Sequence, residues 1–233
     1  ATNNKLYVGR MGIFGERTAN LAAQSSDLMI IIGTRLSIPQ TGYNKKNFSP
    51  NSKKIYIDID HNEMNSKEFL NLDVKIKRDI QLFLKETNKF LKNKKIKKFN
   101  PWISLINDWK RKYIIRNKIG NLKSKYINSF DFIDILSKNL NGNETIVTDM
   151  GTSFTCTMQT FKILKPKSQR LFTSSGLAAM GFGLPGIIGA YFANKNKNPI
   201  CISGEGGLMF NLQELQTVKN YKIPLKLFII ENK

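Results

Sequence analysis

The chain has 233 residues, of which 41% are hydrophobic and 23% charged, proportions typical of a globular protein with room for two modest domains. Its formal net charge of +20 comes from lysines that accompany asparagine and isoleucine along the chain, and no motif joins aromatic and basic residues, so we expect no nucleic-acid partner. Cys156 and Cys201 exclude a disulfide framework and suit a reducing cytoplasm, and the one histidine, His61, has neither a nucleophile nor zinc ligands around it.

The first elements predicted in chain order form half of a doubly wound α/β unit. Helical spacing of alanine and leucine predicts a helix over residues 18–26, and the apolar run 27–33 predicts a buried parallel strand. A second strand is predicted over residues 54–60, after a loop rich in proline, asparagine and lysine. The unit begins abruptly, so we expect its earlier strands to lie outside this chain.

A helical, lysine-rich connector is predicted next. A helix from Asp79 runs into the lysine-rich residues 92–98, and an amphipathic helix follows from Pro101. We therefore expect a first domain over residues 1–91 and a connector over residues 92–127.

The second predicted unit, residues 128–233, again has the element order of a parallel sheet. Ser129 is expected to cap a helix over residues 130–140. Strands are predicted at residues 145–149, 199–203 and 225–230, with helices between them. The fold class that follows is α/β, with two open parallel-sheet doubly wound units.

One apolar segment of the second unit has the character of a membrane span without its length. Residues 177–193 carry no charge, but seventeen residues are fewer than the ~20 needed to cross a bilayer, and Pro185 and several glycines interrupt them. We expect a buried loop leading into a helix and no membrane partner. Residues 1–5 lack the apolar region of a signal peptide, which also favours a cytoplasmic location.

Three glycine turns of the second unit are the candidate binding elements. They are residues 149–153, 175–185 and 203–207, and each leads toward a helix. In open parallel sheets, ligands bind where strands end in such turns, because the backbone N–H groups of the following helix favour anions. A single turn of this kind is weak evidence, whereas three within one domain predict a phosphate-containing ligand.

A carboxylate and an amide are expected at the same edge of this sheet. Glu205 lies between glycines after one strand, and Asn232 follows the next strand 27 residues later. Adjacent parallel strands would bring the two side chains together, and their oxygens are ligands that hard cations such as Mg²⁺ prefer.

These spacings resemble a known family. Glycine, acid and glycine at residues 204–206, followed by a strand-end Asn232, is similar to the signature of thiamine diphosphate enzymes, a Gly-Asp-Gly turn and a later Asn-Asn pair. Residues 175–190 resemble the cofactor loop of acetolactate synthases, and residues 151–153 resemble the diphosphate-contacting turn of the pyruvate decarboxylase branch.

The first unit extends the resemblance over nearly the whole chain. Residues 9–15, 33–35 and 57–60 resemble the second half of the family's Rossmann-like central domain. Acetolactate synthases hold FAD with this part of the fold, whereas other members keep the fold without the flavin. The resemblance therefore implies thiamine diphosphate and Mg²⁺ as cofactors and leaves FAD as an open alternative.

The resemblance implies a role for each matching residue. Glu205 and Asn232 would coordinate Mg²⁺, Met180 would be the wedge beneath the cofactor, and the Ala178 carbonyl would accept a hydrogen bond from the aminopyrimidine. The diphosphate would be held by the turn residues Gly151, Thr152, Ser153, Gly204, Gly206 and Gly207. Without the motif, Met180 would be interpreted as an ordinary core methionine.

The sequence departs from the family pattern in three places. Glu205 stands where the family usually has Asp, which extends the carboxylate by one methylene, and Glu231 replaces the first Asn of the pair. Nothing corresponds to the pyrimidine-binding domain, whose glutamate activates the cofactor. We therefore expect the chain to be a fragment, truncated at its C-terminus and inactive by itself.

The functional hypothesis is an acetolactate synthase-like lyase or transferase. It would decarboxylate a 2-oxo acid, pyruvate first among them, and transfer the two-carbon unit to a carbonyl acceptor. A simple 2-oxo acid decarboxylase and a non-catalytic remnant of the fold are the alternatives. The expected partners are the pyrimidine-binding domain and a second copy, in a homodimer or homotetramer.

Overall fold

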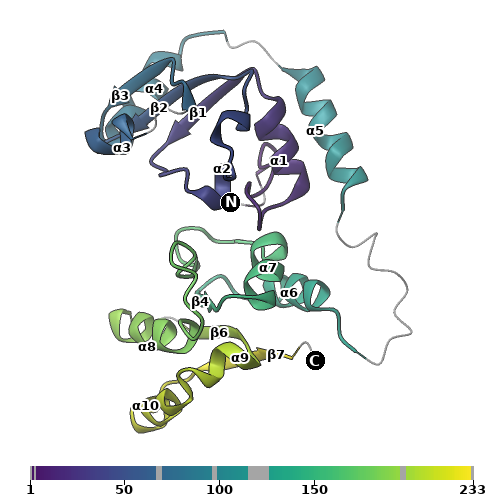
Figure 1. The fold of residues 1–233 in the computed structure, drawn as a ribbon, viewed down its shortest axis with the longest axis vertical. Coiled ribbons are helices and arrows are strands. Elements are labelled where there is room, and N and C mark those ends of the chain that lie inside the picture. The colour runs from purple at the N-terminus through teal and green to yellow at the C-terminus, as the bar shows by residue number, and fades with distance from the viewer. Residues whose placement is uncertain are drawn as a thin grey trace. The chain divides into compact units, whose positions relative to one another are not determined.

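The computed structural model describes residues 2, 4–66, 70–95, 99–114, 126–194 and 198–231. The chain divides into two compact units, both drawn in Figure 1. The N-terminal unit is Val8–Tyr113, and the C-terminal unit is Ile114–Lys233 together with Ala1–Tyr7. Thr2 joins the C-terminal unit through its hydroxyl, which donates to the carbonyl of Ile163 at 2.9 Å.

The N-terminal unit contains a three-stranded parallel sheet in the order β1-β2-β3. Its strands are β1 (Leu28–Ile32), β2 (Lys53–Asp58) and β3 (Val74–Lys77). Its helices are α1 (Arg17–Ser25), α2 (Ile38–Thr41), the 3-10 turn η1 (Lys45–Asn47), α3 (His61–Asn65), α4 (Ile80–Leu91) and α5 (Asn100–Lys112). Ile31 and Tyr56, which pair across β1 and β2, form its core with Met64.

The connector prediction overlaps this unit. Helix α5 occupies part of the predicted connector and belongs to the N-terminal unit, whose last residue is Tyr113. Of the lysine-rich run, residues 96–98 lie outside the described residues. The two predicted strands of this unit are confirmed, although β1, which was expected to be buried, has Leu28 and Ile30 exposed. Strand β3 was not predicted, because its alternating valine, isoleucine and lysines lie mostly exposed at the sheet edge.

The C-terminal unit contains a four-stranded parallel sheet in the order β5-β4-β6-β7. Its strands are β4 (Glu144–Thr148), β5 (Arg170–Phe172), β6 (Asn198–Gly204) and β7 (Lys226–Ile230). Its helices are α6 (Ser129–Lys138), α7 (Thr152–Thr160), α8 (Gly183–Ala193), α9 (Glu205–Met209), the 3-10 turn η4 (Leu212–Glu214) and α10 (Leu215–Asn220).

Both faces of this sheet are covered by helices (Figure 1). Ile146 of β4 and Ile200 of β6 pack with α6 and α7, whereas Val147 and Cys201 face α8. Successive strand residues point to opposite faces, so an unbroken apolar strand needs a helical layer on each side. This arrangement confirms the predicted fold class, α/β with doubly wound parallel sheets.

Two local predictions were wrong or incomplete. The cap of α6 is Asn128 rather than Ser129, because the Asn128 Oδ1 accepts from the N–H groups of Phe130 and Asp131 at 2.9 and 3.2 Å. Strand β5, three residues long, was not predicted. The uncharged segment 177–193 ends in α8, which packs on the sheet, and no helix in the described ranges has the length and apolar character of a membrane span.

Candidate functional site

The three glycine turns follow three neighbouring strands of one sheet. Strand β4 leads through the first turn into α7, β5 leads through the second turn to α8, and β6 leads through the third into α9. All the strands are parallel, so the three turns lie at the same carboxyl edge. The prediction that each turn leads toward a helix is confirmed, and the parallel sheet brings all three turns to one edge.

The first turn presents open space at its glycine. Gly151 has φ +88°, and a Cβ built on it would meet no atom within 4 Å. Thr152, the first residue of α7, is exposed, whereas Ser153 is buried. The Ser153 hydroxyl donates to the carbonyls of Asp149 and Met150, both at 3.1 Å, so its side chain fixes the backbone of the turn.

The second turn contains an exposed segment, residues 175–180, which ends at the buried Gly181. Ala178 has φ +56°, and its N–H donates to the Ser174 carbonyl at 2.8 Å. The side chain of Met180 is 55% exposed, which rules out the interpretation as an ordinary core methionine. The next residue, Gly181, is buried.

The third turn approaches the second. A Cβ built on Gly206 would meet only the Met180 Cε, at 3.8 Å, and this is the distance that brings the two turns together. Gly204 and Glu205 join β6 to α9, and Glu205 is exposed. Gly207 is buried, and a Cβ there would lie 2.7 Å from the Asp149 Oδ2, so a side chain at this position would displace that carboxylate.

The strands that carry the predicted metal ligands are neighbours. Strands β6 and β7 are parallel, and Gly204 pairs with Ile230, so Glu205 and Glu231 follow paired residues. Asn232 lies outside the described residues. No cluster of three or more metal-binding His, Cys, Asp or Glu side chains occurs within the described ranges. The strand adjacency required by the prediction is confirmed, and a site formed by Glu205 and Asn232 stays a prediction.

Asp149 is the site residue that the sequence reasoning did not single out. It follows β4 directly, is 1% exposed, and its carboxylate accepts hydrogen bonds from Met150, Gly181 and Ser203. One of these donors belongs to each of the three turns. Burial, and after it the charge of Asp149, raises the pKa of the nearby Cys201 thiol to about 12.

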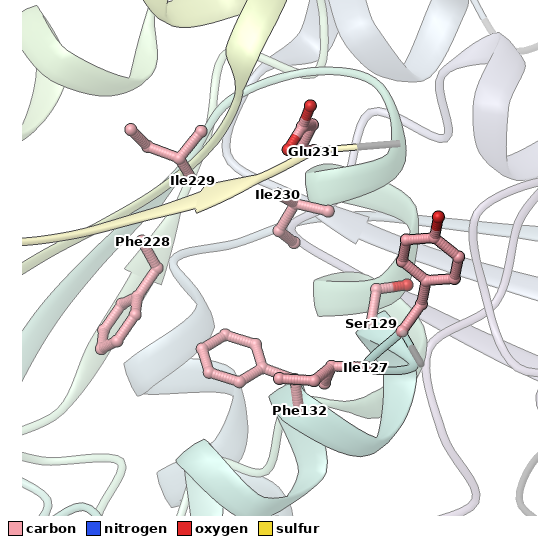
Figure 2. Close-up of a pocket in the computed structure, with 8 residues that line it drawn as sticks. Ile127, Ser129, Phe132, Phe228, Ile229, Ile230 and Glu231 are labelled. Atoms are coloured by element: carbon pink, nitrogen blue, oxygen red, sulfur yellow. The ribbon is translucent and has the colours of Figure 1, made fainter. Parts of the chain in front are cut away.

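A cavity of about 440 Å³ lies between the start of α6 and the end of β7 (Figure 2). The rings of Phe132 and Phe228 meet edge to face there, with centroids 5.3 Å apart. Ile229 and Glu231 line the cavity along β7. Its lining is mostly apolar, and none of the three glycine turns contributes to it.

The strand ends of the N-terminal unit are also tied together. The Tyr56 hydroxyl donates to the Thr34 carbonyl at 2.9 Å and to the Asp58 carboxylate at 3.4 Å. Burial, then the charges of Asp58 and Glu63, raises the pKa of Tyr56 to about 12. Arg35, 79% exposed, lies 3.5 Å from Glu63. A flavin at this edge stays a prediction.

Two protein families match the two parts of the chain. Residues 1–87 match the family described as "Thiamine pyrophosphate enzyme, central domain", and residues 149–233 match "Thiamine pyrophosphate enzyme, C-terminal TPP binding domain". The chain belongs to the thiamine pyrophosphate enzyme family. Thiamine pyrophosphate is another name for thiamine diphosphate, so the family expected from the sequence is confirmed.

Several curated relatives are similar over nearly the whole chain. The "Probable acetolactate synthase large subunit" of Methanococcus aeolicus is 36% identical over 99% of this chain and 40% of its own length. The acetolactate synthase large subunit of Cyanidium caldarium is 34% identical over 98% and 38%. The acetolactate synthase isozyme 2 large subunit of Escherichia coli is 31% identical over 97% and 39%. The chain thus spans about two fifths of the length of these relatives.

Proposed function

We propose that this chain is the central and diphosphate-binding part of an acetolactate synthase-like enzyme that uses thiamine diphosphate and Mg²⁺. The enzyme would decarboxylate a 2-oxo acid, with pyruvate first, and transfer the two-carbon unit to a carbonyl acceptor. The observation that carries the proposal is the meeting of three glycine turns at one sheet edge, where Met180 reaches within 3.8 Å of the Cβ position at Gly206.

The turns fit a diphosphate. Space is open above Gly151 and Gly206, and neither α7 nor α9 has a side-chain cap at its first turn. Backbone N–H groups at such positions favour an anion. We assign the diphosphate to the first and third turns, that is, to Gly151, Thr152, Ser153, Gly204, Gly206 and Gly207.

The exposed segment of the second turn would face the rings of the cofactor. The Ala178 carbonyl would accept a hydrogen bond from the aminopyrimidine, and Met180 would support the bent arrangement of the two rings. When bound, thiamine diphosphate supplies an electron sink for the decarboxylation of the 2-oxo acid. The protein supplies the geometry, through the positions of Ala178 and Met180.

The metal ligands in this proposal are Glu205 and Asn232. Glu205 is exposed at the start of α9, where its carboxylate is available to a cation. Mg²⁺ requires a nearly ideal octahedron, and the extra methylene of glutamate over aspartate shifts the oxygen position. We therefore expect a Glu205→Asp variant to change the affinity for Mg²⁺ and its preference over Mn²⁺.

The pyrimidine-binding domain and a second copy of the protein complete the proposed enzyme. The relatives that the chain matches are about two and a half times its length, which leaves room for that domain in the natural protein. Product analysis separates this proposal from its alternatives. Acetolactate indicates the synthase, acetaldehyde alone indicates a simple decarboxylase, and cofactor binding without turnover of pyruvate indicates a non-catalytic member of the family.

The experiment that tests the proposal measures cofactor binding in this chain and turnover at the protein's natural length. Titration calorimetry with thiamine diphosphate and Mg²⁺ gives the dissociation constant. Gly206→Ala places a methyl group in the open cradle without a backbone clash, so we expect weaker binding by about tenfold. Gly189→Ala is the matched control, because this exposed glycine of α8 also has open space and lies outside the turns. Equal affinities in both variants would contradict the assigned cradle.

A further inference from the structure

We propose that Asp149 and Asn211 are positioning residues that bind the two backbone polar groups of Gly181, its N–H and its carbonyl. By doing so they would fix the exposed segment that carries Ala178 and Met180. The catalytic meaning of this clamp rests on the proposed function. The clamp itself is a property of the chain and can be tested without any cofactor.

Asp149 binds the N–H group of Gly181. Its Oδ1 accepts from the Gly181 N–H at 3.0 Å, and its Oδ2 accepts from the same N–H at 3.1 Å. The carboxylate also accepts from the Met150 N–H at 2.8 Å and from the Ser203 hydroxyl at 3.1 Å. A buried carboxylate is tolerated when several donors satisfy it, and hydrogen bonds to a charged acceptor are stronger than neutral ones. A single buried group therefore links all three turns.

Asn211 binds the carbonyl group of Gly181. Its Nδ2 donates to the Gly181 carbonyl at 2.9 Å, so side chains bind both polar groups of Gly181. The residue must be glycine, because φ is +84° and a Cβ would lie 2.7 Å from the Phe210 Cβ and 2.8 Å from the Asn211 Nδ2. The sequence thus places a backbone position that only glycine can occupy immediately after Met180.

The exposed segment depends on this anchor because little else holds it. Leu177 is 90% exposed and Met180 55%, so packing does not fix their positions. In the described part of the chain, the backbone N–H groups of Leu177 and Ala178 donate to the Ser174 carbonyl at the start of the segment. Its other end is fixed at Gly181. The position of Met180 is therefore set by the backbone of Gly181, which Asp149 and Asn211 bind.

Asn211 provides the specific test, since among the three turns its side chain contacts Gly181 alone. Asn211→Asp keeps the shape of the side chain but replaces the N–H donor by an oxygen that repels the Gly181 carbonyl. Asp149→Asn is the conservative variant. Its Oδ1 still accepts from Gly181, and its Nδ2 can donate to the Ser203 hydroxyl, which already donates to the Gly204 carbonyl in the native protein.

The matched control is Glu144→Gln. Glu144 is a second buried carboxylate at the opposite end of the same strand, where it also accepts backbone N–H groups. Its replacement should weaken the C-terminal unit without touching Gly181. It therefore separates a loss of overall stability from a loss of the clamp.

The first readout is amide hydrogen exchange of residues 174–182 in the cofactor-free protein. We expect exchange of the Gly181 amide to rise by about tenfold in Asn211→Asp relative to the wild type, the loss of one hydrogen bond of ordinary strength. Asp149→Asn should retain most of the protection. Unchanged exchange at Gly181 in Asn211→Asp would overturn the proposal, as would an equal rise throughout the C-terminal unit matching that of Glu144→Gln.

The second readout concerns thiamine diphosphate bound to the protein at its natural length. We expect Asn211→Asp to slow exchange of the thiazolium C2 proton by about tenfold while the dissociation constant changes by less than about threefold, because the diphosphate turns keep their geometry. A loss of affinity with an unchanged exchange rate would overturn the positioning role. Failure of the wild type to bind the cofactor would refute the proposed function, and the amide exchange would still decide the clamp.

Discussion

The two ends of strand β4 solve the same chemical problem in different ways. Glu144 begins the strand and is 3% exposed, and Asp149 follows its other end and is 1% exposed. Glu144 accepts from the N–H groups of Asn141 and Gly142 at 2.8 and 2.9 Å, and from the Gln169 side chain at 3.0 Å. Burying a carboxylate costs free energy, and in both cases hydrogen bonds from N–H and O–H donors offset that cost.

The difference lies in what the donors belong to. Around Glu144 the groups satisfy one another, since the Gln169 side chain also accepts from Leu164 and the Ser168 hydroxyl donates to the Gly142 carbonyl. Around Asp149 the donors belong to three separate turns, and the exposed residues Gly151, Met180 and Glu205 lie within two positions of them. A closed network stabilises a loop, whereas a network with exposed neighbours holds a site in place.

The largest expected effect comes from Gly181→Ala at the site end of the strand. The added Cβ requires a positive φ and collides with Phe210 and Asn211, so we expect the C-terminal unit to lose about 3 kcal/mol of unfolding free energy. Gly151→Ala is the control, because it imposes the same kind of strain but meets no neighbour and should cost about 1–2 kcal/mol. Calorimetric thermal unfolding measures both. Equal losses would mean that the close contacts at Gly181 relax freely.

The second prediction exchanges carboxylate for amide at both ends. At Glu144 all three partners are N–H donors, so the Nε2 group of Glu144→Gln faces a donor, and we expect a loss of about 2 kcal/mol. Asp149→Asn meets a hydroxyl that can accept, so its loss should be smaller. Affinity for thiamine diphosphate should fall more in Asp149→Asn than in Glu144→Gln, because only Asp149 contacts the glycine turns. A larger stability loss for Asp149→Asn would remove the contrast between the two networks.

The design of these measurements follows from the sequence. Both tryptophans, Trp102 and Trp109, lie in the N-terminal unit, where their rings stack edge to face with centroids 5.8 Å apart. Tryptophan fluorescence therefore follows unfolding of the N-terminal unit and should be insensitive to variants of β4. Calorimetry or amide exchange is needed for the C-terminal unit.

Local patterns in the sequence were sufficient to predict the elements and turns of the site. The apolar runs of β4 and β6 are buried on both faces, so their sequence predicts a helical layer on each side. The run of β1 also predicted its strand, although Leu28 and Ile30 are exposed. The glycine turns were predicted because residues 151, 181 and 206–207 are glycines next to strand ends or helix starts. The edge strand β3 was missed because its side chains are largely exposed, and the edge strand β5 because it has only three residues and therefore shows no apolar pattern.

The role of Asp149 could not be predicted from local pattern. Its partners Gly181 and Ser203 lie 32 and 54 residues away, so the network exists only in the folded sheet. A carboxylate directly after a buried strand and before Met150 and Gly151 is the one signal that could have identified it. The cap of α6 was misassigned for a related reason, because Asn128 and Ser129 are both good capping residues and only the backbone geometry decides between them.

A third buried carboxylate, Asp134 of α6, gives a smaller and pH-dependent effect. Burial by itself would raise the pKa of Asp134, but hydrogen bonds from Lys138 and Lys162, at 2.6 and 2.9 Å, outweigh it and lower that pKa. Because the pKa is lower in the folded state, ionised Asp134 stabilises the protein at pH values above its unfolded-state pKa of about 3.9. This stabilisation is lost as the pH falls through the folded-state pKa.

Thermal unfolding of the wild type and Asp134→Asn between pH 7 and pH 3 measures this contribution. Both lysines are nearly half-exposed, so solvent screening limits the difference to about 1 kcal/mol at pH 7. The difference should shrink as the pH falls below about 4. A constant difference over the whole range would show that Asp134 acts through packing rather than through its charge.

The smallest expected effect concerns the thiols on either side of the sheet. Cys201 faces α8 beside Asp149, and Cys156 of α7 lies in the opposite layer, and both are buried. Burial raises the pKa of each thiol, to about 12 for Cys201, which disfavours the reactive thiolate, and it also shields both sulfur atoms from reagents. We expect iodoacetamide to label neither cysteine in the folded protein during a time that labels both in denaturant.

Asp149→Asn should leave this protection intact, because burial is the larger cause of the raised pKa at Cys201 and the charge of Asp149 the smaller one. Rapid labelling of Cys201 in that variant alone would instead mean that Asp149 closes this layer of the core as well as the site edge, and the distinction between the two ends of β4 would no longer hold.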